Sequence, residues 1–186
     1  MDSDVKSRAR KAAFAARKAV FGGADVSDRV VAANAHLNAV LAGYAGQTVA
    51  GYMPMRTEIS PLAAMHAHHG GLCVPVIMAP ATPLRFAAYH AGADMTEGAF
   101  GAYIPADLAY LIPTVLIVPL LAYDARGYRL GYGGGFYDRT LEGLRAAGKI
   151  TAIGFAFGGQ KVDQVPIDAT DQRLDMIVSE NGCLAF

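Results

Sequence analysis

The chain has 186 residues, of which 53% are hydrophobic and 17% are charged, and its 16 basic and 16 acidic side chains leave no formal net charge. We expect one domain over residues 1–186, because this length and composition supply a single core and exclude an intrinsically disordered chain. Balanced charge argues against nucleic acid or an anionic membrane as the main partner. The longest apolar run, residues 108–121, is broken by two prolines and is short for a bilayer span of about 20 residues.

The two cysteines, Cys73 and Cys183, lie far apart in the sequence. They are too few for a disulfide framework or a zinc site. A reducing cytoplasm is therefore the expected location.

The first part of the chain alternates between helical and extended patterns. Residues 5–20 predict a helix, and residues 27–43 predict a second helix with Ser27 as its N-cap. A strand at residues 48–53 is followed by a turn and then by a helix that begins at Ser60-Pro61. This order of elements is typical of α/β proteins.

Three charged residues in this part are candidates for a binding site. Lys6 and Arg10 are four residues apart in the first helix, so they share one face, although this spacing is also typical of a solvated basic face. Glu58 lies in the turn between a strand and a helix, where α/β proteins place binding residues. An acidic residue is also favoured there simply because a helix N-terminus follows. The three histidines within residues 66–69 are better explained as a polar helix end than as a metal cluster.

Further strands are predicted along the rest of the chain at residues 72–78, 84–90, 114–121, 151–157 and 174–178. Between the second and third of these, residues 92–105 give mixed signals, with glycines and Pro105 marking loops. Alternation of strands with helices predicts an α/β fold with a mostly parallel sheet. Ligand sites in such folds lie at the carboxyl ends of the strands.

A glycine-rich loop at residues 129–139, with the sequence Arg-Leu-Gly-Tyr-Gly-Gly-Gly-Phe-Tyr-Asp-Arg, is the most informative stretch. It follows the apolar strand at 114–121 and precedes a short amphipathic helix that ends at Gly148. Such a loop gathers free backbone N–H groups and the positive end of a helix dipole, which together bind anions. Arg129 and Arg139 add positive charge, and Asp138 adds a carboxylate suited to Mg²⁺.

The loop matches neither common nucleotide motif. It lacks the Gly-Lys-Ser/Thr ending of a P-loop, and the third glycine of the dinucleotide pattern would fall at Phe136. A glycine-rich hairpin and helix cap without any ligand is the alternative. Loops of this kind more often carry function.

The loop closely resembles the ATP loop of the 5-formyltetrahydrofolate cyclo-ligases, also called 5,10-methenyltetrahydrofolate synthetases. Lys6 and Arg10 resemble the N-terminal Lys-x-x-x-Arg of that family, and Met53 with Glu58-Ile59-Ser60 resembles its folate-side segment. Pro119 with Tyr123-Asp124 resembles the lead-in to its loop. The stretch from Gln160 through Val165-Pro166 and Asp171 to Asp175 resembles its C-terminal segment. The resemblance therefore spans nearly the whole chain.

Three departures from the family pattern concern the folate pocket more than the nucleotide chemistry. The family often has a glutamate before the long strand, which residues 100–105 lack. Some members carry a lysine where this chain has Gly134, and Leu120 replaces a glycine.

The resemblance implies a single-domain three-layer sandwich like the NagB/RpiA/CoA-transferase-like fold. It also implies ATP-dependent conversion of 5-formyltetrahydrofolate, with or without a polyglutamate tail, to 5,10-methenyltetrahydrofolate, with release of ADP and phosphate. ATP would phosphorylate the formyl oxygen, N10 would attack the activated carbon, and loss of phosphate would close the ring. Such phosphoryl transfer depends on positioning and charge neutralisation rather than on a protein nucleophile.

The resemblance also implies roles for particular residues. Arg129 and Glu58 would serve the reaction, Met53 and Glu58 would bind the folate, and Asp138 and Asp171 would hold Mg²⁺. The residues assigned to ATP are Lys6, Arg10, Arg129, Leu130, Gly131, Tyr132, Gly133, Gly134, Gly135, Phe136 and Tyr137. The three aromatic residues of the loop could stack on rings, although Phe136 and Tyr137 are also plausible core residues.

Two other functions remain open at the level of sequence. A sugar-phosphate isomerase or CoA-transferase-like enzyme would use the same kind of sheet and would act without ATP. A non-catalytic folate- or nucleotide-binding paralogue would bind ligand without releasing ADP. The basic first helix gives a weaker nucleic-acid alternative, which the zero net charge disfavours.

Overall fold

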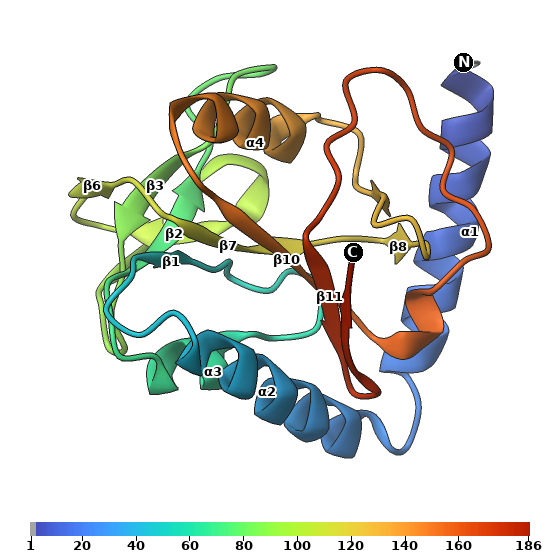
Figure 1. Cartoon of the computed structure of the whole chain (residues 1–186), viewed down its shortest axis with the longest axis horizontal. Helices are drawn as coiled ribbons and strands as arrows, with labels where there is room; N and C mark the ends of the chain where they lie inside the picture. The colour runs from blue at the N-terminus through green and yellow to red at the C-terminus, as the bar shows by residue number, and fades with distance from the viewer. Residues whose placement is uncertain (1–2) are drawn as a thin grey trace.

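The computed structural model describes residues 3–186 and is built on one eight-stranded sheet (Figure 1). The strand order is β12-β11-β10-β7-β1-β2-β3-β6. Strands β1, β2, β7, β10 and β11 are parallel, whereas β3 and β12 run antiparallel to their neighbours. The bounds are β1 Val49–Ala50, β2 Leu72–Val76, β3 Arg85–Ala88, β6 Tyr110–Leu111, β7 Val115–Pro119, β10 Thr151–Phe155, β11 Met176–Ser179 and β12 Gly182–Ala185.

Helices cover both faces of this sheet. Helices α2 (Val26–Ala42) and α3 (Leu62–Ala67) lie on one face, and α4 (Phe136–Ala147) lies on the other (Figure 1). Along β7, Val115 and Ile117 belong to the core beneath α2, and Leu116 and Val118 pack in the core with Leu141 of α4. The strand is apolar throughout because both of its faces are buried. The three-layer α/β sandwich expected from the sequence is confirmed.

The order of the strands creates a crevice at the centre of the sheet. From β1 the chain moves outward to β2 and β3, whereas from β7 it moves the other way to β10 and β11. Strands β1 and β7 are neighbours, so the direction of winding reverses between them. Open α/β sheets bind ligands at such a switch point, beyond the carboxyl ends of the strands.

Helix α1 (Ser3–Phe21) stands at the end of β7 rather than covering either sheet face (Figure 1). It packs on a hairpin formed by β8 (Ala122–Tyr123) and β9 (Arg129–Leu130) and on the 3₁₀ turn η2 (Gly158–Gln160). The contact is a small apolar cluster that includes Ala13, Leu121 and Val165. This packing brings the basic side of α1 to the glycine-rich loop.

Several local features differ from the sequence expectations. Ser27 is not the N-cap, since α2 already begins at Val26 after Asp25, and α3 begins at Leu62, after Pro61. The mixed stretch contains a small hairpin of β4 (Met95–Glu97) and β5 (Tyr103–Pro105), joined by the 3₁₀ turn η1 (Ala99–Gly101). Strand β12 was not expected either, because an exposed edge strand of four residues leaves little apolar pattern. None of the helices in the described part of the chain is long and apolar enough to cross a membrane.

Candidate functional site

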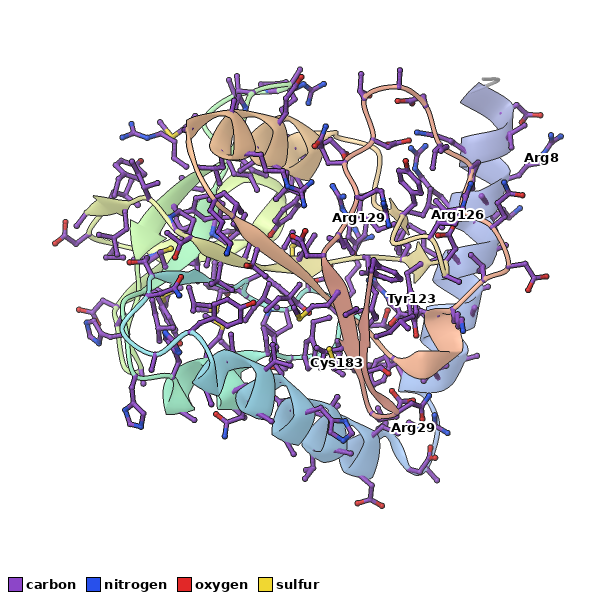
Figure 2. All side chains as sticks on the ribbon, viewed as in Figure 1. Arg8, Arg29, Tyr123, Arg126, Arg129 and Cys183 are labelled. Carbon is purple, nitrogen blue, oxygen red and sulfur yellow. The ribbon has the colours of Figure 1, made fainter. Side chains whose placement is uncertain are left out.

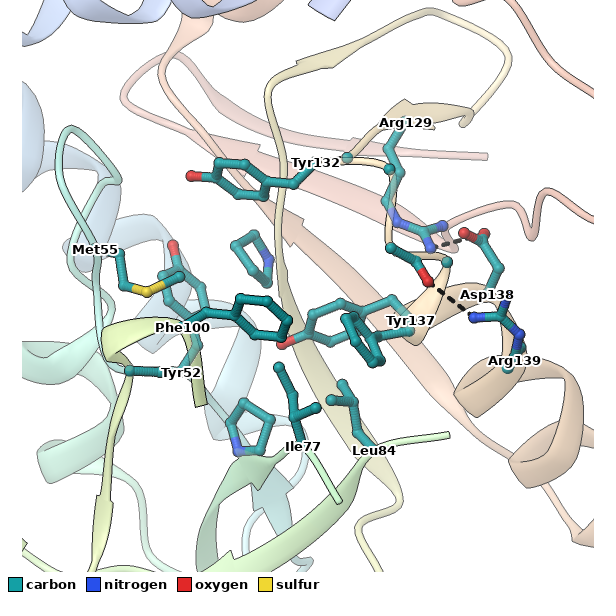
Figure 3. A pocket seen from close by; sticks show the side chains of 18 of the residues that line it. Tyr52, Met55, Ile77, Leu84, Phe100, Arg129, Tyr132, Tyr137, Asp138 and Arg139 are labelled. Carbon is teal, nitrogen blue, oxygen red and sulfur yellow. Dashed lines mark hydrogen bonds and ion pairs between the residues drawn. The ribbon is translucent and has the colours of Figure 1, made fainter. Parts of the chain in front are cut away.

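A cavity of about 950 Å³ opens at the carboxyl ends of β1, β2 and β7. Tyr52 and Ile77, just beyond β1 and β2, form part of its wall (Figure 3), as does Pro119 at the end of β7. All of the site residues predicted from the sequence line this one cavity: Lys6, Arg10, Met53, Glu58, Arg129, Leu130, Gly131, Tyr132, Gly133, Gly134, Gly135, Phe136, Tyr137, Asp138 and Asp171. The fold thus brings together segments from the beginning, middle and end of the chain.

The glycine-rich loop needs its glycines for two different reasons. Gly133 and Gly135 have φ angles of 101° and 65°, in the left-handed region that other residues rarely adopt. At Gly134, an added Cβ would lie 2.6 Å from the ring of Phe136. The last of these glycines, Gly135, directly precedes α4 and lines the cavity, so the N-terminus of α4 lies at the cavity end that carries the cations, where helix amides favour an anion.

Four cations surround the loop, and each is already held by a partner within the protein. The Lys6 ammonium lies 2.7 Å from Asp168 and 2.6 Å from Asp171. Arg129 donates to the Asp138 carboxylate at 2.8 Å and to the Gln172 carbonyl at 2.7 Å (Figure 3). The remaining two cations bond to loop carbonyls: Arg10 to Gly131 at 3.2 Å and Arg139 to Gly134 at 2.8 Å. The loop is therefore ordered by side chains that can also reach an anion.

The Lys6 contacts shift the ionisation of both partners. Burial acts to lower the pKa of Lys6, but its bonds to Asp168 and Asp171 outweigh burial and leave that pKa raised. The pKa of Asp168 falls well below its usual range, chiefly because Lys6 donates to its carboxylate and secondarily because Thr170 does. Both groups are charged at neutral pH, so the pair holds the C-terminal segment against α1.

The two acidic residues predicted to hold Mg²⁺, Asp138 and Asp171, both line the cavity. The hydrogen bonds from Arg129 and from the Gln172 amide both end on Oδ1 of Asp138, and those from Lys6 and the Asp168 amide both end on Oδ2 of Asp171. Within residues 3–186 no three acidic, histidine or cysteine side chains gather closely enough to hold a metal by themselves. The two carboxylates of Asp138 and Asp171 suit an ion that takes one or two protein carboxylates and completes its coordination shell with phosphate oxygens and water, as Mg²⁺ does.

The other end of the cavity is mostly apolar and carries one buried carboxylate. Its wall includes Tyr52, Met53, Met55, Ile77, Leu84, Phe100, Tyr103 and Ile104. The Glu58 side chain is 3% exposed, with Oε1 accepting a 2.6 Å hydrogen bond from the Tyr132 hydroxyl and Oε2 accepting a 2.9 Å bond from the Met55 amide. Burial, followed by the charge of Glu58, raises the pKa of Tyr132 to about 12, so this hydroxyl stays protonated and donates. Glu58 is fixed in place with acceptor capacity left for a ligand.

Tyr137 presents an unsatisfied group at the centre of the site. Its side chain lines the cavity, and its hydroxyl is shielded from solvent without a hydrogen-bond partner in the described part of the chain (Figure 3). Burial raises the pKa of this hydroxyl well above its usual value, so it remains a donor. A buried polar group without a partner is costly, and a ligand in the cavity could supply the missing acceptor.

Sequence reasoning missed Arg17. It was not among the candidate residues of the first helix, yet it is 1% exposed and bonds to Tyr132. Lys6, Arg10, Phe14 and Arg17 follow one another at intervals of three or four residues, so they form one stripe of α1. Continuing the Lys6–Arg10 spacing along the helix would have identified it.

The model of the 5-formyltetrahydrofolate cyclo-ligase family matches residues 2–180 of the chain. The chain belongs to this family. The 5-formyltetrahydrofolate cyclo-ligase of Escherichia coli K12 is 36% identical over 101 residues, which cover 52% of this chain and 55% of the relative. The match thus spans only about half the length of that cyclo-ligase. A longer match of 155 residues, to the cyclo-ligase of Mycolicibacterium smegmatis, is 28% identical and covers 76% of this chain and 78% of the relative.

Solved structures of the cyclo-ligase family share the fold over nearly the whole chain. The Aquifex aeolicus 5,10-methenyltetrahydrofolate synthetase superposes with a TM-score of 0.74 at 26% identity, covering 97% of this chain and 92% of that one. The Mycoplasma pneumoniae synthetase gives a TM-score of 0.73 over 97% of this chain and 99% of that one, and at 22% identity it supports the fold alone. The resemblance noted in the sequence is therefore confirmed at the level of family and fold.

Proposed function

We propose that this chain converts 5-formyltetrahydrofolate to 5,10-methenyltetrahydrofolate with hydrolysis of ATP to ADP and phosphate. The observation that supports the proposal most strongly is that one cavity holds both the cation-rich glycine loop and a buried carboxylate at an apolar end. A triphosphate suits the first end, and a pterin suits the second. The names of the matching relatives agree with this chemistry.

The proposed reaction is a phosphoryl transfer followed by ring closure. The N5-formyl group is amide-like, so its oxygen is a poor leaving group. Transfer of the γ-phosphoryl group forms an O–P bond at that oxygen and breaks the bond to ADP. The N10 lone pair then attacks the formyl carbon, N10 loses its proton, and the C–O bond breaks to release phosphate. No protein nucleophile is needed, only alignment and stabilisation of charge.

Arg129 is the proposed stabiliser of the transferring group. It is 8% exposed, and its guanidinium is fixed by Asp138 and by the Gln172 carbonyl. A buried and fixed charge stabilises developing negative charge without having to reorganise during the reaction. Lys6, Arg10 and the loop amides would hold the remaining phosphate oxygens.

Glu58 is proposed to accept hydrogen bonds from the N–H groups of the pterin, with Met53 contacting its ring. The Tyr132 and Met55 contacts hold the carboxylate in one orientation, so its remaining lone pairs have a fixed direction.

Asp138 and Asp171 would hold Mg²⁺ together with phosphate oxygens. The ion would supply charge neutralisation on the phosphates. Asp138 already orients Arg129, so the same carboxylate would link the ion to the proposed stabiliser.

A cytoplasmic location is part of the proposal. Cys73 and Cys183 are both free thiols in the structure, which fits a reducing compartment.

The test is an absorbance assay for methenyltetrahydrofolate with the purified chain and 5-formyltetrahydrofolate. We expect product only when both ATP and Mg²⁺ are present, with one ADP formed per product. Ligand binding without ADP release would identify a non-catalytic paralogue instead. Turnover of a sugar phosphate or a CoA ester without ATP would support the competing enzyme class.

A further inference from the structure

Arg17 is a buried cation that does not line the cavity. It lies in α1, where neighbouring cations such as Arg8 extend into solvent (Figure 2). The Arg17 side chain is 1% exposed, whereas the Arg8 side chain is 69% exposed. Burying a guanidinium is costly unless its donors are satisfied, so its contacts indicate what it stabilises.

The guanidinium of Arg17 contacts three separate segments. Nε donates to the Thr57 hydroxyl at 3.1 Å, and one terminal nitrogen lies 3.4 Å from the Leu120 carbonyl at the end of β7. The other terminal nitrogen donates to the Tyr132 hydroxyl at 2.7 Å. The Arg17 guanidinium therefore connects the turn that carries Glu58, the end of the central strand β7 and the glycine loop.

Tyr132 links Arg17 to Glu58. Its hydroxyl accepts from Arg17 and donates to Glu58, so the three groups form one directed chain. Arg17 also lies 3.7 Å from Glu58 and is the cation paired with that buried carboxylate. The Tyr132 ring is fixed as well, because Phe14 packs edge-on against it at 5.3 Å and the Arg17 guanidinium lies 5.4 Å from its centre.

We propose that Arg17 is a positioning residue that, through Tyr132, holds Glu58 in the orientation that receives the folate. The assignment of the folate to Glu58 rests on the proposed function; the relay from Arg17 to Glu58 rests on the contacts alone. Arg17 acts at the Glu58 end and not on the phosphates, which are assigned to other cations.

The shape of arginine suits this role better than that of lysine. Three contacts in three directions need a planar fork, and an ammonium offers only a point charge on a flexible stem. A lysine at this position would keep the charge near Glu58 but could not hold all three partners. The Arg17→Lys variant therefore separates charge from geometry.

The relay can be tested without any ligand. Tyrosine labelled with ¹³C at Cζ gives an NMR signal for Tyr132 that is assigned by its absence in Tyr132→Phe. We expect this signal to shift in Arg17→Met and in Glu58→Gln. Lys18→Met is the matched control, since Lys18 is the next residue of α1 and is exposed. In this variant the Tyr132 signal should match that of the wild type. An unchanged Tyr132 signal in Arg17→Met would overturn the relay, whatever the enzyme binds.

The consequence for the site is tested by calorimetry on the full chain with Mg²⁺. We expect Arg17→Met to weaken binding of 5-formyltetrahydrofolate about tenfold, the loss typical of a disturbed charge-assisted hydrogen bond. Binding of a non-hydrolysable ATP analogue should change by no more than about twofold, because the relay runs through the Tyr132 hydroxyl to Glu58, whereas the phosphates are assigned to the loop amides and to other cations. Arg17→Lys should fall short of restoring wild-type folate affinity. Equal losses for both ligands would assign Arg17 to general support of the fold and overturn the proposal, as would wild-type folate affinity in Arg17→Lys.

A double variant provides the sharpest comparison. Tyr132→Phe keeps the ring and its packing on Phe14 while removing the hydroxyl that links Arg17 to Glu58. If the two residues act in series, Arg17→Met combined with Tyr132→Phe should bind folate no more weakly than the weaker single variant. Additive losses would contradict the relay. A wild-type chain that binds no folate would instead refute the proposed function, while the NMR result would still decide the relay.

Discussion

The two ends of the cavity are built in different ways. At the glycine-loop end, the charged groups are paired with one another: Lys6 with Asp168 and Asp171, and Arg129 with Asp138. At the Glu58 end, a single carboxylate is held by a hydroxyl, an amide and a buried guanidinium within an apolar wall.

The difference indicates how each end would receive its ligand. An anion at the glycine-loop end can exchange one set of charged partners for another, so its binding changes contacts that already exist. A ligand at the Glu58 end meets a carboxylate whose geometry is already fixed. We therefore expect changes at the loop end to act mainly on turnover and changes at the Glu58 end mainly on folate affinity.

The largest effect is expected for Arg129→Ala. Loss of one fixed charge that stabilises the transition state typically reduces turnover by about 10²–10³-fold. The absorbance assay for methenyltetrahydrofolate measures it. Arg29→Ala is the control, because Arg29 is paired with Asp25 and Glu180 away from the cavity and should leave turnover unchanged (Figure 2). Wild-type turnover in a folded Arg129→Ala protein would remove this residue from the mechanism.

Glu58→Gln tests the opposite end. The amide keeps the size of the side chain but replaces one acceptor oxygen by a donor, so we expect the dissociation constant of 5-formyltetrahydrofolate to rise about 10–100-fold. The ATP analogue should bind as in the wild type, and calorimetry measures both affinities. If Glu58→Gln weakened binding of the ATP analogue instead, the assignment of the folate to the Glu58 end and of the nucleotide to the loop end would be contradicted.

A pair of glycine substitutions separates the loop from the helix that follows it. Gly135 has a φ of 65°, and an added Cβ would lie 2.9 Å from Arg139, so Gly135→Ala should destabilise the protein by about 1–2 kcal/mol. Gly143 lies within α4 with open space around it, so Gly143→Ala should stabilise by about 0.5–1 kcal/mol. Urea unfolding of the two variants gives both values. Equal changes in the free energy of unfolding would show that alanine adopts the backbone conformation of Gly135 without strain.

The smallest effect concerns pH. The pKa of Asp168 is lowered in the folded protein, so its contribution to stability is present above the ordinary value of about 3.9 and is lost as the pH falls below it. The pKa of Lys6 is raised, so its contribution is lost only as the pH rises through and above about 10.4. Asp168→Asn should therefore lower the melting temperature most between these limits, and by an amount that corresponds to less than about 1 kcal/mol, because the Asp168 side chain is 45% exposed and solvent screens its charge.

The melting temperatures of wild type and Asp168→Asn, followed from pH 3 to pH 9, test this window. We expect the two curves to converge as the pH falls below about 4. A constant difference down to pH 3 would mean that Asp168 acts through something other than its charge.

Contiguous parts of the site could be predicted from the sequence, and the parts assembled from distant segments could not. The strand β7, the glycine loop and helix α4 lie in one continuous stretch of the chain, residues 115–147, so periodicity and glycine content were enough to predict them. Lys6 and Arg10 could be joined to the loop only through the family resemblance, because their spacing alone equally suits a solvated face. Arg17 continues the spacing of Lys6 and Arg10 along the helix, but it was not singled out, because that spacing does not signal that the helix will lie across the end of a strand. The hairpin of β4 and β5 was missed because strands of three residues give no measurable alternation.

Lys6 and Asp171 are separated by 165 positions in the sequence. During synthesis, a ribosome would therefore have released nearly all of the chain before the phosphate end of the cavity could close. Long separations of this kind slow the formation of the contacts concerned, since the intervening chain must first be ordered. Binding of a triphosphate would then report completion of the whole fold, which makes it a useful probe for the last step of folding in a stopped-flow experiment.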